Sequence, residues 1–70
     1  MNLLEAEIGR TYQIREIETL DEELNAFLLR LGAYPGEPIT VISKKRKSCI
    51  VLLKNSRYGL DFALSQAVII

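Results

Sequence analysis

The sequence predicts a mainly β fold, a small closed five-stranded barrel with one α-helix inserted after the first strand. Five short segments rich in β-branched and apolar residues are separated by turn-forming residues. One amphipathic segment follows the first of them, and 70 residues leave no room for a second layer. Closure would remove the exposed edges that an open sheet of this size would present, so a barrel is the expected architecture.

The helix is expected at residues 21–31. Four apolar side chains recur at the spacing that places them on one helix face: Leu24, Phe27, Leu28 and Leu31. Thr19 and Glu22 have the spacing of a capping box, which predicts that Thr19 caps the helix start. Gly32 follows the last apolar position, where a left-handed residue commonly closes a helix.

Strands are expected on both sides of this helix. Residues 11–17 have no cleanly apolar face, which suits a strand that bends at a barrel corner. Pro35-Gly36 marks a turn after the helix, and Pro38 stands at a strand start, where a missing amide does least harm. The other strands are expected at residues 39–43, 49–54, 58–62 and 68–70, with a hairpin connection at 44–47 and a helical turn at 63–67.

Length and composition indicate a single domain, residues 1–70. Apolar runs such as residues 50–53 are far shorter than the roughly 20 residues of a membrane-spanning helix, so no membrane insertion is expected. Charges throughout residues 2–15 argue against a secretory signal. The single cysteine, Cys49, cannot form an internal disulfide, which favours a reducing, cytoplasmic setting. Within a strand, Cys49 is expected to be a buried apolar residue.

Charge is balanced overall but uneven along the chain. Residues 1–37 hold eight acidic and three basic residues, a net charge of −5, whereas residues 38–70 hold one acidic and six basic residues, a net charge of +5. Such a distribution can orient a charged partner, although an acidic helix start and one basic turn explain most of it. The basic run at residues 44–47 has no interleaved aromatic, so we expect a solvated hairpin tip and no nucleic-acid site. Contact with an anionic membrane surface is the alternative.

The sequence offers no recognisable catalytic, cofactor or metal site. It contains no histidine, its serines have no candidate base at a familiar spacing, and its four glycines are isolated rather than gathered in a phosphate loop. The only soft metal ligands are Cys49 and Met1, whereas ferrous sites usually combine imidazole with carboxylate. We therefore expect a binding protein and not an enzyme.

A series of residues along nearly the whole chain resembles one known family. Its most specific element is Leu-Gly-x-x-Pro-Gly directly after the amphipathic helix. The full series is Leu4, Gly9, Tyr12-Gln13-Ile14, Leu31-Gly32, Pro35-Gly36, Arg57, Leu60 and Ala67. This order is similar to that of the ferrous iron transport protein A (FeoA) family. The resemblance implies an SH3-like barrel in a small cytoplasmic protein.

The same resemblance implies a role in ferrous iron uptake and iron homeostasis. The implied partner is FeoB, a membrane transporter with a cytoplasmic G-protein domain, which the protein would bind and regulate from the cytoplasmic side. Apart from the resemblance, we expect a monomer, with an exposed edge at the apolar end, residues 68–70, as the alternative. The candidate contact residues lie in two segments: Leu31, Gly32, Tyr34, Pro35, Gly36, Arg57, Leu60, Phe62 and Leu64. Tyr34 and Phe62 are the expected anchors, because aromatic side chains often dominate binding energy. Ordinary packing is the alternative interpretation for either one.

A second interpretation belongs to another class of protein. A related barrel ends metal-dependent repressors of the diphtheria toxin repressor type, so the chain could be a stand-alone SH3-like regulatory or interaction module with weak transition metal ion binding. It lacks the DNA-binding and dimerisation domains of such a repressor. SH3 ligand grooves are lined with aromatics, and this chain has five, of which Phe27 is expected in the core. So few available aromatic side chains argue against recognition of proline-rich peptides.

Overall fold

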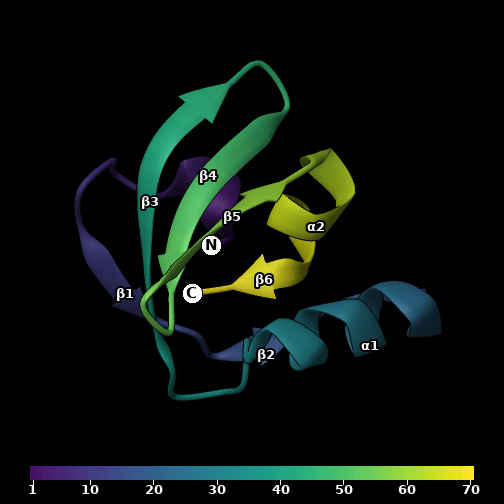
Figure 1. Ribbon diagram of the computed structural model, residues 1–70. Coiled ribbons are helices and arrows are strands. Elements are labelled where there is room, and N and C mark those ends of the chain that lie inside the picture. The colour runs from purple at the N-terminus through teal and green to yellow at the C-terminus, as the bar shows by residue number, and fades with distance from the viewer.

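Six strands and two α-helices follow one another in the order shown in Figure 1. The computed structural model describes residues 1–70. Its elements are the 3-10 helix η1 (Leu3–Glu5), β1 (Thr11–Gln13), β2 (Glu16–Ile17), α1 (Glu22–Leu31), β3 (Pro38–Lys45), β4 (Ser48–Leu53), β5 (Ser56–Leu60), α2 (Phe62–Ala67) and β6 (Val68–Ile69).

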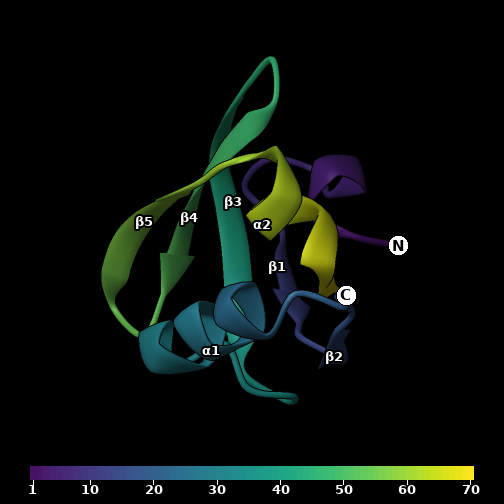
Figure 2. The ribbon, with the colours of Figure 1, turned by 90° about the vertical axis from the view of Figure 1, so that its right-hand side faces the viewer.

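The strands form two antiparallel sheets instead of one closed barrel. The larger sheet has the order β1-β3-β4-β5, and the smaller one pairs β2 with β6. Both helices and the β2–β6 pair lie on the same side of the larger sheet (Figures 1 and 2). The mainly β class is as predicted, but there are six strands where five were expected, and neither sheet closes on itself.

The expected first strand, residues 11–17, is divided into β1 and β2. Pairing of β1 with β3 ends at Pro38, which has no amide hydrogen to continue the ladder. The Ile14 amide instead donates to the Glu37 carbonyl at 2.9 Å, and the Arg15 amide donates to Ile69 at 2.7 Å. The chain thus passes from one sheet to the other at Ile14, so the predicted corner exists and α1 follows the second strand.

Helix α1 begins one residue later than predicted, and its cap is different. The Asp21 carboxylate accepts the amides of Glu23 and Leu24 at 3.0 and 3.1 Å, so Asp21 is the N-cap. Thr19 does not cap the helix, because its hydroxyl accepts the Asp21 amide at 3.1 Å. Gly32 closes the helix in the left-handed conformation, with φ 96°, as predicted.

One core lies between the larger sheet and the elements that cover it. Its buried apolar residues are Leu3, Ala6, Ile14, Leu28, Ala33, Ile39, Val41, Cys49, Val51, Leu53, Leu60, Ala67, Val68 and Ile70. Leu28 is the only one of them that α1 contributes, while Leu24 and Leu31 are half-buried. Phe27 is 39% exposed, so its predicted place in the core is wrong. Cys49 is buried, as expected.

In the last third of the chain, the strands and the helix begin and end at residues other than those predicted. A tight turn and a helix cap explain the differences. A two-residue turn, Lys54-Asn55, joins β4 to β5, and both residues have the positive φ that tight hairpin turns favour. The Asp61 carboxylate accepts the Leu64 amide at 2.9 Å and caps α2. Phe62 therefore begins a helix and does not end a strand, and the predicted strand at residues 58–62 lies at Ser56–Leu60.

Replacing Gly32 should destabilise the fold through backbone strain, because the Lys54 side chain beside it is exposed and can move aside. Gly32→Val puts a β-branched residue at φ 96°, and its Cβ would lie 2.6 Å from Cδ of Lys54. Such strain costs about 1–3 kcal/mol, measurable by urea unfolding. Gly36→Val is the matched control, because Gly36 has φ 92° and open space around its Cα. Equal stability of Gly32→Val and the wild type would contradict the observed helix end.

Leu28 should hold α1 to the body of the molecule. We expect Leu28→Ala to lower the free energy of unfolding by about 2–5 kcal/mol, because it leaves a cavity under the helix. Leu20→Ala, the same change at a fully exposed leucine just before α1, should stay within about 0.5 kcal/mol of the wild type. Comparable losses in the two variants, measured by thermal unfolding, would show that α1 is held by something else.

Candidate functional site

The segment after α1 forms a rigid turn that presents an aromatic ring. The Glu37 amide donates to the Tyr34 carbonyl at 3.0 Å, with Pro35 and Gly36 between them. Proline followed by a glycine with φ 92° is typical of a type II turn. The Gly36 amide also donates to the Ile14 carbonyl at 2.6 Å, which fixes the turn to the body. Tyr34, at its start, is 50% exposed.

Lys54 joins this turn to the β4–β5 turn. Its aliphatic chain passes beside the Cα of Gly32, and its ammonium group lies 3.0 Å from Oε1 of Glu37. An exposed ion pair contributes about 0–1 kcal/mol, so the contact matters mainly for position. Residues 32–37 and the turn Lys54-Asn55 thus form one surface, which we call the turn platform.

A shallow groove of about 310 Å³ borders the turn platform. Its walls are Glu37, Pro38, Thr40, Leu52, Lys54 and Asn55. Leu52 is the exposed apolar residue among them, and it pairs across the sheet with Arg57 of β5. Arg57 is itself exposed and makes no ion pair. This end of the molecule therefore offers an aromatic ring, an apolar side chain and one unpaired cation, Arg57, to a partner.

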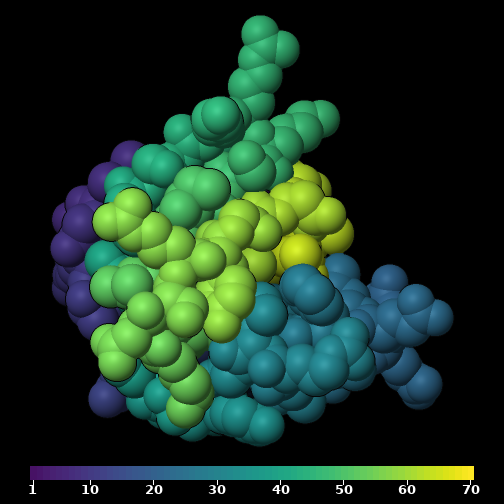
Figure 3. Space-filling view, viewed as in Figure 1, coloured from purple at the N-terminus to yellow at the C-terminus, as the bar shows by residue number.

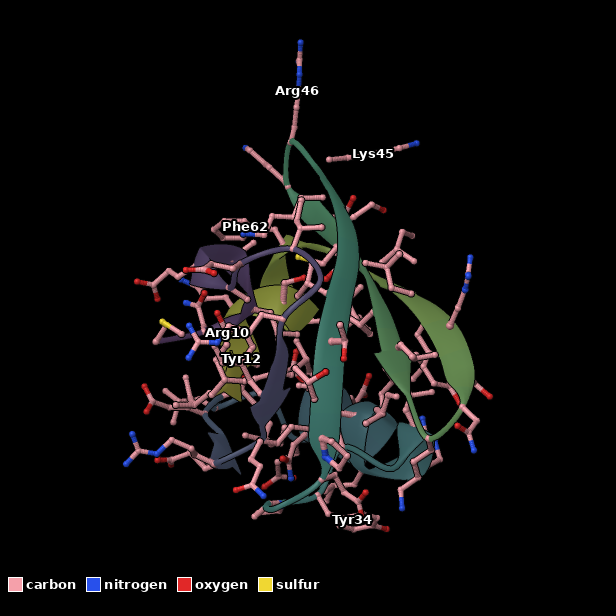
Figure 4. The ribbon with its side chains drawn as sticks, turned by 90° about the vertical axis from the view of Figure 1, so that its left-hand side faces the viewer. Arg10, Tyr12, Tyr34, Lys45, Arg46 and Phe62 are labelled. Carbon is pink, nitrogen blue, oxygen red and sulfur yellow. The ribbon has the colours of Figure 1, made fainter.

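The structure brings some of the predicted contact residues together and separates others. Leu31, Gly32, Tyr34, Pro35 and Gly36 lie in or next to the turn platform, and Arg57 lies beside its groove. Phe62 lies at the opposite end of the molecule from Tyr34 (Figure 4). Leu60 is 2% exposed in the core, and Leu64 packs against the core from α2. A single partner surface that includes all nine residues is therefore not present.

Sequence reasoning missed Lys54 and Leu52 as parts of this surface. Asn in a short loop between two apolar runs is a hairpin signal, which could have placed Lys54 in the turn. Leu52 gave no signal, because residues 49–53 are apolar throughout and the alternation of faces cannot be read from such a run. The exposure of Leu52, 40%, shows that its side chain points outward from the sheet.

Neither a cluster of metal ligands nor a membrane-spanning helix is found in the molecule. No group of three or more His, Cys, Asp or Glu side chains is arranged to hold a metal ion. Neither helix has the length and apolar character required to cross a bilayer. The acidic residues at the start of α1 remain dispersed along its first turn, where they complement the helix dipole.

The topology defines a small, mainly β domain, and its fold matches that of an SH3 domain protein. The model of the FeoA domain matches residues 1–70, and the chain belongs to the FeoA family. The predicted resemblance is thereby confirmed. A search of curated proteins found no match by sequence.

Solved structures share this fold at low sequence identity. FeoA of Stenotrophomonas maltophilia, a zinc complex described as an SH3 domain protein and a candidate ferrous iron transport activating factor, is 19% identical with a TM-score of 0.86 over 99% of this chain and 87% of its own. An iron uptake regulatory protein (FeoA) is 20% identical with a TM-score of 0.85, over 97% of this chain and 91% of its own.

The third similar structure is that of a longer protein. A manganese-dependent transcriptional repressor is 16% identical with a TM-score of 0.87, and the match covers 96% of this chain but 38% of the repressor. The predicted relation to a domain of metal-dependent repressors is therefore present at the level of fold.

Proposed function

We propose that this protein is a non-enzymatic accessory factor of ferrous iron uptake that binds and regulates the transporter FeoB on its cytoplasmic side. Membership of the FeoA family supports this role. Similar proteins are described as an iron uptake regulatory protein and as a candidate transport activating factor. The contact surface we assign to the chain is the turn platform with Arg57.

The observation that carries this assignment is the half-exposed Tyr34 on a preorganised turn. Hydrogen bonds from Gly36 to Ile14 and from Glu37 to Tyr34 already fix the backbone. Binding through such a turn loses little conformational entropy, because the loop is ordered before the partner arrives. A tyrosine adds a large apolar ring with one polar group, the combination that is enriched at interface hot spots.

The charged residues near Tyr34 indicate which charge the partner should carry at the proposed contact. Arg57 makes no ion pair, whereas Lys54 is held by Glu37. An arginine without a carboxylate partner can form a bidentate contact with a carboxylate of the transporter. We therefore expect the partner face to combine an apolar pocket for the tyrosine ring with an acidic side chain beside it.

Tyr34→Ala and Arg57→Gln test this surface by calorimetric titration with the isolated cytoplasmic domain of the transporter. Tyr34→Ala should weaken binding by about tenfold to a hundredfold, as expected for loss of a hot-spot aromatic. Arg57→Gln should weaken it less, with a reduced salt dependence. Ile8→Ala is the control, since Ile8 is an exposed apolar residue of the N-terminal turn. Wild-type affinity in both platform variants would exclude the turn platform as the contact.

A second candidate function follows from the likeness to the repressor domain. The chain could act as a stand-alone regulatory module that binds a transition metal ion weakly. A part amounting to 38% of the repressor has the same fold as 96% of this chain, and this likeness is the observation that favours the alternative. The module would bind a short acidic peptide near the cations that are free of ion pairs.

Manganese titration followed by amide NMR separates the two functions. The adaptor proposal expects only weak, diffuse broadening around the acidic start of α1, because the carboxylates there are dispersed. A metal-sensing module would show broadening confined to a few neighbouring residues at low metal concentration. Localised broadening of that kind would favour the second function over the first.

A further inference from the structure

The β3–β4 hairpin carries a cluster of exposed cations beyond the body of the molecule. Its strands reach Lys45 and Ser48, so the turn is Arg46-Lys47. The tip stands out from the rest of the surface in Figure 3, and Arg46 extends farthest from the body in Figure 4. Lys45, Arg46 and Lys47 are exposed, and we call them the basic tip.

No carboxylate of the protein neutralises the basic tip. The two ion pairs of the molecule join Arg10 to Glu7 and Lys54 to Glu37. Lys44, at the base of the hairpin, instead donates from Nζ to the Leu4 carbonyl at 2.8 Å, which ties the hairpin to η1. The tip is thus held outward with three positive charges that have no internal partner.

An exposed aromatic ring lies at the same end of the molecule. Leu60 of β5 pairs with Cys49, one residue from the start of β4, so the chain leaves the sheet beside the hairpin. Phe62 follows and is 44% exposed at the start of α2, on the hairpin side in Figure 4. The one acid nearby in sequence, Asp61, has an oxygen engaged with the Leu64 amide. The end of the molecule therefore combines cations with an apolar side chain.

Three of the other eight acidic residues lie far from the basic tip, whereas Glu5 lies in η1 near the base of the hairpin. Asp21, Glu22 and Glu23 lie at the start of α1, which projects away from the hairpin in Figure 1. Residues 38–70 carry a net charge of +5 and residues 1–37 a net charge of −5. Four of the six basic residues of this half are consecutive at the hairpin, whereas Lys54 and Arg57 lie at the other end of β4 and β5. The hairpin end thus carries the densest run of positive charge and would turn toward a negatively charged surface.

From these observations we propose that the basic tip and Phe62 bind the anionic phospholipid headgroups of a membrane surface. A convex tip can touch a flat surface, whereas it offers no groove for a peptide. Cations near an anionic leaflet are attracted within a Debye length, and apolar side chains such as that of phenylalanine bury at the boundary between headgroups and acyl chains. The contact is peripheral and does not insert a helix.

A nucleic acid would require a different distribution of charge. Binding along a phosphate backbone uses basic residues spread over a face, commonly with stacking aromatics between them. Here the three cations are consecutive at the end of one hairpin, Lys44 before them is engaged with the Leu4 carbonyl, and Ser48 after them is neutral. The cluster therefore fits a small area of a bilayer better than it fits a length of DNA or RNA.

This inference is independent of the proposed function, but the two are geometrically compatible. Tyr34 lies at the end of the molecule opposite the basic tip (Figure 4). A molecule bound to a leaflet through the tip would direct its turn platform away from the bilayer. The platform would then be free to contact a domain that stands above the membrane.

Vesicle flotation of the full chain tests the proposal. The probes are vesicles of phosphatidylcholine alone and of phosphatidylcholine with an equal amount of phosphatidylglycerol, at low and high salt. We expect binding only to the anionic vesicles, with loss at high salt. Lys45→Gln, Arg46→Gln and Lys47→Gln combined should lower the partition coefficient by about tenfold to a hundredfold. Phe62→Ala should weaken binding to the anionic vesicles at low salt without removing its salt dependence, because the contribution of Phe62 is apolar.

A second triple variant, which loses the same number of positive charges at other sites, is the control for the position of the charges. Arg15→Gln, Arg30→Gln and Arg57→Gln combined remove the same charge from exposed sites outside the tip, and this variant should retain anionic binding to within a few-fold. Far-UV circular dichroism verifies that each variant is folded. Equal losses in both triple variants would overturn the proposal in favour of a general charge effect. Absent binding at low salt, or tighter binding to duplex DNA than to anionic vesicles, would also overturn it.

Discussion

The arrangement of this molecule depends on the pairing of its last strand. β6 pairs with β2 through Ile17 and Val68, and Ile69 also bridges to Asn2 near the start of the chain. The Ile70 amide donates to the Met1 carbonyl at 2.9 Å. Because Val68 and Ile70 are buried, this pairing joins the smaller sheet to the core. A chain of 70 residues can form only a small core, and the two strands of the smaller sheet cover one side of that core.

This pairing also determines where α1 and the turn platform lie. The Glu18 amide donates to the Ala67 carbonyl at 2.8 Å just before the helix, and Gly36 donates to Ile14 just after it. Helix α1 is therefore held at both ends by backbone hydrogen bonds and between them by Leu28. These hydrogen bonds and the packing of Leu28 also fix the position of the turn that presents Tyr34. An exposed aromatic on so restrained a loop is suited to recognition, because little entropy is lost on binding.

The sequence predicted the elements better than the way they connect. Leu24, Phe27, Leu28 and Leu31 correctly indicated a helix, but periodicity alone could not show that the helix touches the core mainly through Leu28. Likewise, the absence of an apolar face in residues 11–17 indicated a corner. It did not reveal that the strand changes sheets there, because that depends on distant partners, the Glu37 carbonyl and Ile69.

Prediction of the candidate contact residues was limited in the same way, because local features could be predicted and the arrangement of distant segments could not. The Leu-Gly-x-x-Pro-Gly element correctly placed a left-handed helix end and a tight turn, since glycine conformation and proline geometry are local properties. The separation of Phe62 from Tyr34 could not be predicted, because it depends on Asp61 capping a new helix at the far end of β5. Family resemblance supplied the functional hypothesis, and the three-dimensional arrangement shows that the nine candidate residues do not form one surface.

The most direct test of the central claim is a map of amide chemical shifts as the isotopically labelled chain is titrated with the cytoplasmic domain of FeoB. We predict saturable shifts concentrated in residues 32–37, in Lys54-Asn55 and around Arg57, with the β3–β4 hairpin unaffected. Shifts confined to α2 and the hairpin, or no shifts at saturating partner concentration, would contradict the assignment of the turn platform as the transporter contact.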